Sequence, residues 1–185
     1  FEQQRELTNM TNSLLLLSDN RAGQQSYPQV RLDGLVFRSV EIVRNIFATA
    51  NIEVVFEGDI PGEDAMMVAG NEPLLLMAFN NLIKNAIQYS SRKSVLVTIR
   101  VEGQRREVEF KNDGEFLSEE EQRMLFMPFY RGSNAGASRG YGLGLPLVLH
   151  IADLHNAAIT YYRETEFNVF IFSFAQVPMP VRQVV

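Results

Sequence analysis

The stretch Asn71-Glu-Pro-Leu-Leu-Leu-Met-Ala-Phe-Asn-Asn-Leu-Ile-Lys-Asn-Ala-Ile-Gln-Tyr89 predicts a long helix with two chemically different faces. Its first residue is a favoured N-cap, and the glutamate after it places a negative charge in the first turn, where the helix dipole stabilises it. At about 100° per residue, one face is an apolar stripe made of Leu75, Phe79, Leu82 and Ala86. Asn81, Asn85 and Gln88 gather on another face. Two amides one turn apart could hold a hydrated divalent cation through their carbonyl oxygens, although a polar helix edge is the simpler explanation.

Helices and strands alternate on both sides of this helix. The expected strands are 29–32, 52–56, 66–69, 94–101, 106–110, 158–162 and 167–174, and the other expected helices are 33–50, 118–126 and 145–155. Ser118 and Glu121 have the spacing of a capping box, and Asp33 is a suitable N-cap for its helix. Since several consecutive strands would pair as hairpins, as around Gly103, we expect a mixed sheet with helices on one face rather than a Rossmann sheet.

Composition and charge exclude several classes of protein. With 185 residues, 46% of them apolar and 21% charged, the chain has the make-up of one globular domain with a short appendage. The net charge of −5 argues against binding to nucleic acid through its phosphates. No apolar run approaches the roughly 18 residues of a membrane-spanning helix, so we expect no membrane contact by this chain. Cysteine is absent and only two histidines occur, which excludes disulfide frameworks and histidine-rich metal sites.

Three segments are expected along the chain. Residues 1–24 carry apolar side chains at helical spacing from Leu7 to Leu17, an amphipathic stripe that needs a partner surface. A short linker follows, then a domain at 28–178 and a C-terminal tail at 179–185. Because the chain begins inside the first helix without a methionine, we expect it to be part of a longer protein.

Two glycine-containing segments offer groups that could contact a ligand. Lys111-Asn-Asp-Gly114 follows a predicted strand, so a side-chain acceptor there could meet a ligand while the glycine lets the backbone approach closely. Gly140-Tyr-Gly-Leu-Gly-Leu145 leads into a helix and would present backbone N–H groups where phosphates bind readily. It is no P-loop, because Gly-Lys-Ser/Thr occurs nowhere in the chain. Taken singly, an ordinary turn and a flexible glycine hinge would also explain the two segments.

Four segments together resemble the N, G1, F and G2 boxes of sensor histidine kinases. They are Asn81-Leu-Ile-Lys-Asn85-Ala, Asn112-Asp-Gly114, Phe126-Met-Pro-Phe-Tyr-Arg131 and Gly140-Tyr-Gly-Leu-Gly-Leu145, in the order and spacing of that family. The resemblance covers about residues 30–175. It implies the α+β fold shared with DNA gyrase B and MutL, a two-layer α/β sandwich in which a mixed, mostly antiparallel sheet is covered on one face by three helices. ATP would lie beneath a lid formed by residues 132–140.

The resemblance assigns roles in binding ATP and Mg²⁺. The residues concerned are Asn81, Asn85, Tyr89, Asn112, Gly114, Tyr130, Arg131, Gly140, Tyr141, Gly142, Leu143, Gly144 and Leu145. Asn85 would bind Mg²⁺, Asn81 would line the phosphates one turn earlier, and Tyr89 would sit beside the nucleotide. Asn112 would accept a hydrogen bond from the adenine amino group, and Gly114 would let the base come close.

The remaining assigned residues belong to the phosphate end of the implied site. Arg131 would reach the γ-phosphate and, with Asn81 and Asn85, would form the catalytic set. The glycines at 140, 142 and 144 would offer N–H groups to the phosphates. Phosphoryl transfer requires mainly positioning and charge neutralisation, which Mg²⁺, an arginine and backbone dipoles supply.

The sequence departs from the family pattern at three positions. The usual Asp-x-Gly-x-Gly has asparagine at 112 and Phe116 in place of the second glycine, and Gln88 stands where a lysine is frequent. A neutral acceptor is about half as strong as a charged one, so ATP binding would weaken by on the order of 1 kcal/mol. A one-residue shift would make Asp113 the adenine ligand, but we favour Asn112 because Gly114 then keeps the expected spacing.

The resemblance implies the catalytic, ATP-binding domain of a bacterial two-component sensor histidine kinase. Such a domain transfers the γ-phosphate of Mg-ATP to a histidine, from which a response regulator takes it. Neither His150 nor His155 lies in a His-Glu-x-x-x-Pro-like motif, so the acceptor is expected outside this chain. Residues 1–24 would be a remnant of the dimerisation segment of a homodimer. The whole protein would be an inner-membrane sensor, with this part in the cytoplasm.

Two alternatives remain open. Asn112, Phe116 and Gln88 suggest a degenerate nucleotide-binding module that regulates a partner without transferring phosphate. A gyrase-type ATPase is disfavoured, because the water-activating glutamate of that family would match position 81, and asparagine cannot act as a general base.

Overall fold

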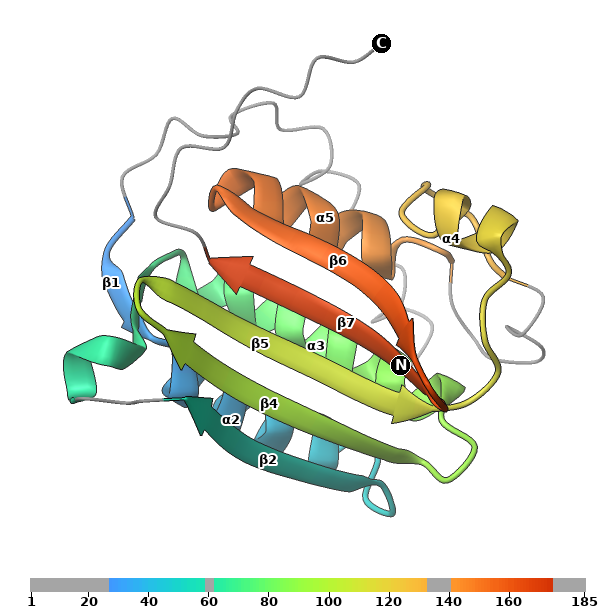
Figure 1. Ribbon diagram of the computed structural model, residues 1–185, viewed down its shortest axis with the longest axis horizontal. Coiled ribbons are helices and arrows are strands. Elements are labelled where there is room, and N and C mark those ends of the chain that lie inside the picture. The colour runs from blue at the N-terminus through green and yellow to red at the C-terminus, as the bar shows by residue number, and fades with distance from the viewer. Residues whose placement is uncertain (1–26, 59–61, 133–140, 175–185) are drawn as a thin grey trace, which may run out of the picture.

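The computed structural model describes residues 27–58, 62–132 and 141–174 (Figure 1). Its elements are β1 (Gln29–Arg31), α2 (Leu32–Arg44), β2 (Asn51–Gly58), a 3₁₀ turn (Glu63–Met66), β3 (Met67–Ala69), α3 (Glu72–Tyr89), β4 (Ser94–Glu102), β5 (Arg105–Asp113), α4 (Glu119–Met124), α5 (Gly144–Leu154), β6 (Ala157–Glu164) and β7 (Phe167–Phe174). The predicted helix at 1–24, the tail at 179–185 and most of the lid at 132–140 lie outside the described residues. Among the helices that the structure describes, none has the length and apolar character needed to cross a bilayer.

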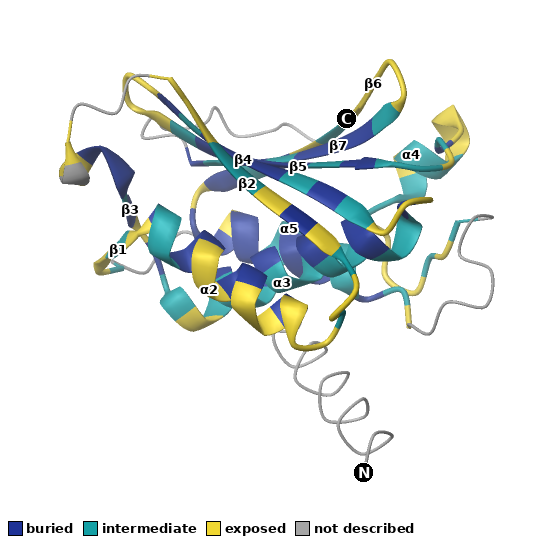
Figure 2. Cartoon of the chain, turned by 90° about the horizontal axis from the view of Figure 1, so that it is seen from below, coloured by how far each residue is buried: buried dark blue, intermediate teal, exposed yellow. Residues whose placement is uncertain are grey.

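Five strands form one sheet in the order β2-β4-β5-β7-β6. Strand β2 runs parallel to β4, and all other neighbours are antiparallel. Helices α2, α3 and α5 cover one face of this sheet (Figure 2). Strands β1 and β3 form a separate two-stranded antiparallel sheet. The expected two-layer sandwich, with a mixed, mostly antiparallel sheet under three helices, is confirmed.

Helix α3 is the central element of the core. The side chain of Asn71 caps it by accepting a hydrogen bond from the N–H of Leu74 at 3.2 Å. The predicted apolar stripe is at most 2% exposed, at Leu75, Phe79, Leu82 and Ala86. Phe79 packs against Phe110 of β5 and Phe172 of β7, with ring centroids 5.8 and 5.5 Å away. Full burial of each large side chain contributes roughly 1.5–3 kcal/mol, so this stripe fixes α3 firmly on the sheet.

Helix α2 is shorter than expected and begins without a side-chain cap. It starts at Leu32, directly after Arg31, and ends at Arg44 instead of near residue 50. Asp33 lies in the first turn, where its carboxylate accepts from the Arg31 guanidinium at 2.7 Å. Arg44 Nη2 donates to the carbonyl of Ile52 at 2.8 Å and ties the helix end to the edge strand β2. The helix ends early because residues 45–50 form turns that lead the chain into β2 at Asn51.

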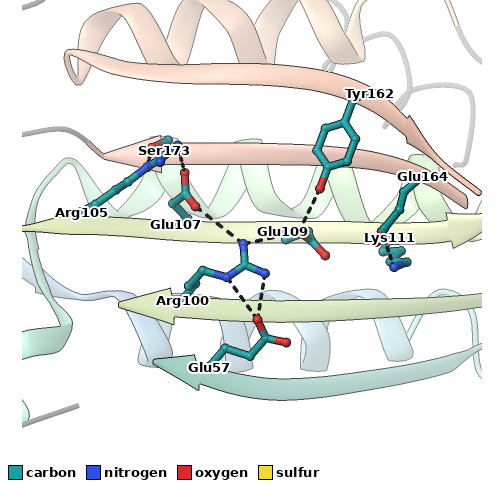
Figure 3. Close-up of polar contacts among 9 residues, drawn as sticks. All are labelled: Glu57, Arg100, Arg105, Glu107, Glu109, Lys111, Tyr162, Glu164 and Ser173. Atoms are coloured by element: carbon teal, nitrogen blue, oxygen red, sulfur yellow. Dashed lines mark hydrogen bonds and ion pairs between the residues drawn. The ribbon is translucent and has the colours of Figure 1, made fainter. Parts of the chain in front are cut away.

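The sheet face away from the helices carries a network of charged side chains (Figure 3). Arg100 of β4 lies 2.8 Å from a carboxylate oxygen of Glu57 on β2, and 3.7 and 3.5 Å from Glu107 and Glu109 on β5. Tyr162 of β6 donates to Glu109 at 3.4 Å. Glu107 and Glu109 are only 5% and 6% exposed, and Arg100 helps to compensate their buried charges, together with Arg105, which lies 2.6 Å from Glu107. Side chains alternate along a strand, so the opposite, helix-covered face receives Val108, Phe110 and Asn112.

Candidate nucleotide-binding site

The N-terminus of α5 lies against the amide pair of α3. Asn81 Nδ2 donates to the carbonyl of Met77 at 2.9 Å, which leaves its Oδ1 on the side of α5. A Cβ atom at Gly144, the first residue of α5, would lie 3.2 Å from Asn81 Oδ1 and 4.0 Å from Asn85 Nδ2. A side chain at position 144 would therefore press on the amide of Asn81 and touch that of Asn85. The fold thus brings together two segments that are far apart in the sequence.

Backbone N–H groups at the start of α5 provide the anion-binding chemistry of this end. The first N–H groups of an α-helix have no intrahelical partner, and the helix dipole adds partial positive charge there. In α5 the N–H of Leu147 closes the first turn by donating to the carbonyl of Leu143 at 3.1 Å. The N–H groups of Gly144 and Leu145 precede that bond, next to the amides of α3. A phosphate placed here would meet backbone donors and the two asparagines.

The segment that ends in Arg131 packs against the glycines before α5. Gly142 has a φ of +69°, and a Cβ there would lie 2.6 Å from the carbonyl oxygen of Tyr130, so only glycine fits. The N–H of Phe129 donates to the Gly142 carbonyl at 2.9 Å. Arg131 and Tyr141 are both exposed. The exposed Arg131 therefore lies beside the glycine segment that leads into α5.

At the other end of the site, the last residue of α3 touches the loop after β5. Gly114 has a φ of +144°, and a Cβ there would lie 2.1 Å from the carbonyl oxygen of Tyr89. Asn112 is 3% exposed, and its Nδ2 donates to the carbonyl of Asp113 at 2.7 Å. The other polar atom of that amide, Oδ1, is its hydrogen-bond acceptor. From Asn81 to Tyr89 the helix rises about 12 Å, so α3 forms a floor between the two ends.

Asp113 is engaged by other groups. Ser90 Oγ donates to one of its carboxylate oxygens at 2.5 Å, and Arg92 Nε donates to the other at 3.0 Å. Burial alone would raise the pKa of Asp113, but the hydrogen bonds from Ser90 and Arg92 and the arginine charge lower that pKa below its usual value. Strand alternation also places Asp113 on the opposite face from Asn112. Both observations favour Asn112 over Asp113 as the residue that would bind the base.

The loop after Gly114 is held by residues to which the sequence analysis gave no role. Phe116, which replaces the second glycine, lies under the guanidinium of Arg163, 3.9 Å from the ring centroid. Asn168 Nδ2 donates to the carbonyl of Glu115 at 3.3 Å, and Tyr161 OH donates to Asn168 Oδ1 at 2.7 Å. The available signal was one asparagine in a strand that is apolar apart from Ser173, since a buried amide needs hydrogen-bond partners.

The donor set near α5 fits Mg²⁺ bound together with a nucleotide. In the described parts of the chain, no group of three or more His, Cys, Asp or Glu side chains could hold a metal ion. Mg²⁺ commonly keeps several waters and takes one or two protein oxygens besides substrate phosphates. The amide of Asn85 beside the anion-binding end of α5 suits that arrangement. Of the residues expected to line the site, Gly140 lies outside the described residues.

Comparison with known families agrees with this geometry. The family model for histidine kinase-, DNA gyrase B-, and HSP90-like ATPases matches residues 70–178, more than half of the chain. The chain therefore belongs to this family of ATPases, as its four motifs indicate.

Within the family, the chain is similar to sensor histidine kinases. It is 32% identical over 186 residues to the heme sensor protein HssS of Staphylococcus saprophyticus, covering 98% of this chain and 39% of that protein. It is 31% identical over 156 residues to the sensor-like histidine kinase SenX3 of Mycobacterium tuberculosis, covering 83% of this chain and 38% of that protein. The chain thus spans about two fifths of the length of these curated relatives.

Solved structures of histidine kinases share the fold. The catalytic domain of histidine kinase ThkA superimposes with a TM-score of 0.67 at 24% identity, covering 81% of this chain and 95% of that domain. The mycobacterial sensor histidine kinase MprB gives a TM-score of 0.69 at 21% identity, over 80% of this chain and 97% of that one. ThkA in complex with the response regulator protein TrrA gives 0.72 at 20% identity, over 96% of this chain and 49% of that one.

Proposed function

We propose that this chain is the ATP-binding catalytic domain of a sensor histidine kinase, which transfers the γ-phosphate of Mg-ATP to a histidine outside the chain. The observation that carries the proposal is the convergence of the α3 amides with the glycine N-terminus of α5. At the other end of α3, the approach of Gly114 to Tyr89 adds a place for a base. The family match supports ATP as the ligand.

At the base end, Asn112 Oδ1 accepts a hydrogen bond from the adenine amino group. Gly114 carries no side chain that could block the base, and Tyr89 flanks the nucleotide. The neutral amide binds more weakly than a carboxylate would. Its near-complete burial compensates in part, because a hydrogen bond is stronger where water is excluded.

At the phosphate end, Asn81 and the N–H groups of residues 142–145 hold phosphate oxygens, and Gly140 adds another N–H group. Asn85 binds Mg²⁺, which neutralises phosphate charge when bound. Arg131 contacts the γ-phosphate and stabilises the charge that develops on it during transfer. Tyr130, Tyr141 and Leu143 complete the lining.

Transfer to a protein histidine is favoured over hydrolysis. Position 81 is an asparagine, whose amide cannot take a proton from an attacking water. The acceptor belongs to a dimerisation segment, of which residues 1–24 are the end, and the phosphate then passes to a response regulator. The complex of ThkA with TrrA supports such a partner. The chain is the cytoplasmic part of an inner-membrane sensor in this proposal.

Calorimetric titration with ATP, with and without Mg²⁺, tests the binding step directly. We expect one ATP per chain and affinity that falls when Mg²⁺ is chelated. Absence of binding in the presence of Mg²⁺ would overturn the proposal. Tight binding without transfer to a supplied acceptor segment would instead favour the regulatory module without activity.

A further inference from the structure

Three side chains line up across the sheet beside the base end of the site. In register, Asn112 of β5 lies opposite Asn168 of β7, which lies opposite Arg163 of β6. Strand alternation places all three on the helix-covered face. Asn112 and Asn168 are 3% and 5% exposed. Buried amides such as these need hydrogen-bond partners.

The partners of Asn168 are the loop that follows Asn112 and a tyrosine. Its Nδ2 donates to the carbonyl of Glu115 at 3.3 Å, and its Oδ1 accepts from Tyr161 OH at 2.7 Å. The backbone of Leu117 also hydrogen-bonds to the Tyr161 hydroxyl. Burial raises the pKa of Tyr161, so the hydroxyl keeps the proton that it donates. The loop is thereby attached to β6 and β7 at two points.

An asparagine at position 112 creates an ambiguity that an aspartate would not. A carboxylate offers only acceptors, whereas an amide rotated by half a turn offers a donor in place of the acceptor. Nδ2 of Asn112 donates to the carbonyl of Asp113 at 2.7 Å, and this bond selects one of the two orientations. The position of that carbonyl depends in turn on the loop, which Asn168 and Tyr161 hold two residues further on.

We propose that Tyr161 and Asn168 are specificity-determining positioning residues that keep the acceptor of Asn112 toward the ligand and so select a 6-amino purine over a 6-keto purine. The inference rests on the proposed function, since it takes Asn112 as the base ligand. Neither residue touches the base. With the loop released, the amide of Asn112 turns over and donates to a keto oxygen.

The test compares binding of ATP and inosine triphosphate, which carries a keto oxygen in place of the amino group. Competition titrations with Mg²⁺ give the affinity ratio for the parent, for Tyr161→Phe and for Tyr162→Phe. The last variant is a matched control, because Tyr162 is the next residue, undergoes the same change and points to the opposite face of the sheet (Figure 3). We expect the parent to prefer ATP about tenfold and Tyr161→Phe to lose most of that preference. Tyr162→Phe should keep it.

A second variant background distinguishes a change in the orientation of the Asn112 amide from a general loosening of the loop. In Asn112→Asp the side chain has no donor to present, so adding Tyr161→Phe should leave the ATP preference unchanged. Tyr161→Phe keeps the ring contact with Phe170 at 5.1 Å and should fold. If Tyr161→Phe does not fold, Asn168→Leu removes the same attachment of the loop and should lose the preference for ATP to the same extent.

Failure of the inference differs from failure of the proposed function. If the parent prefers ATP and Tyr161→Phe weakens both nucleotides equally, the two residues have only a structural role and the inference is wrong. The inference is also wrong if the ratio changes equally in the Asn112→Asp background. If the parent binds neither nucleotide, the proposed function itself is wrong.

Discussion

The contact of Gly114 with Tyr89 sets how closely the loop after β5 approaches the end of α3. A Cβ at 114 would lie 2.1 Å from the Tyr89 carbonyl oxygen, whereas a Cβ at Gly103, whose φ is also positive at +56°, would meet nothing within 4 Å. Gly103→Ala should therefore lower the free energy of unfolding by about 1 kcal/mol through backbone strain alone. Gly114→Ala should lower it by about 3 kcal/mol and weaken ATP binding. Urea unfolding and ATP titration check both variants, and equal losses would contradict the close contact.

Asn85 lies on the edge of α3, outside the apolar stripe, so its side chain can be removed at little cost to the fold. We expect Asn85→Ala to abolish Mg²⁺-dependent nucleotide binding while the thermal midpoint changes by less than about 3 °C. The matched control is Gln88→Ala, which removes another polar side chain of α3 and should retain Mg²⁺-dependent binding. Calorimetry and thermal unfolding measure the two effects. If Asn85→Ala binds nucleotide with unchanged Mg²⁺ dependence, Asn85 does not bind Mg²⁺. If the variant unfolds, the role of Asn85 is structural.

At the scale of elements, one histidine joins α5 to α3. His155, at the end of α5, accepts a hydrogen bond at Nε2 from the N–H of Asn71 at 2.9 Å, and its Nδ1 donates to the carbonyl of Ile151 at 2.6 Å. Tyr27 stacks on the ring with centroids 4.6 Å apart. Only the neutral ring with its proton on Nδ1 can make both hydrogen bonds. Burial lowers the pKa of His155, which agrees with that neutral form.

This histidine makes stability depend on pH in a defined direction. An unfolded histidine titrates near 6.5, and the folded pKa is lower, so the unfolded state binds more protons between the two values. The contribution of His155 is therefore fully present above pH 6.5 and is lost as the pH falls toward the folded pKa. The slope is at most about 1.4 kcal/mol per pH unit. Unfolding curves of the parent and of His155→Gln between pH 5 and 8, roughly the range in which histidine titrates, should show a smaller slope in the variant.

The other histidine gives the control for this measurement. His150→Gln leaves the contacts of His155 in place and should retain the slope of the parent. A parent slope that persists in His155→Gln would show that other groups cause it.

Local signals in the sequence were sufficient for some elements and insufficient for others. The start of α3 and the capping box of α4 were predicted correctly, because the cap and its partner lie within three residues. The predicted end of α2 was wrong, because residues 45–50 turn the chain into β2, and the pairing of β2 with β4 is a tertiary contact. In the candidate site, the fold brings Gly144 next to Asn81 and Asn85, and Gly114 next to Tyr89, while the roles of these residues stay predictions. Asn168 was missed, because its role depends on the register of β5 and β7, which a single sequence does not show.

For the whole molecule, geometry limits which histidine can receive phosphate. The two histidines of the chain lie on or just after α5, the helix whose N-terminus we propose as the phosphate site. A rigid helix cannot bring its own side chains within about 3–3.5 Å of a phosphate at its tip. We therefore expect the chain to bind ATP without labelling itself. Supplied with a separate dimerisation segment that carries the acceptor histidine, it should phosphorylate that segment.

Arg131→Ala should slow this transfer far more than it weakens ATP binding, because the arginine acts mainly on charge that develops during transfer. Incubation with radiolabelled ATP, followed by an acid-lability test, measures both labelling reactions. Self-labelling that disappears on changing His150 or His155 would contradict the geometric limit.

The apolar stripe of helix α3 packs in the core, and the edge that carries its amides faces the candidate site. Any ligand held at that edge opposes the loosening of the helix on which the whole fold depends. At a hundred times its dissociation constant, a ligand that binds only the folded state adds about 2.7 kcal/mol against unfolding. If that ligand is ATP, as we propose, the abundance of the protein in a cell would then follow the ATP concentration. When the ATP concentration falls, more of the chains would unfold and be degraded by proteases, so that starvation would lower the amount of the protein as well as the fraction that holds ATP.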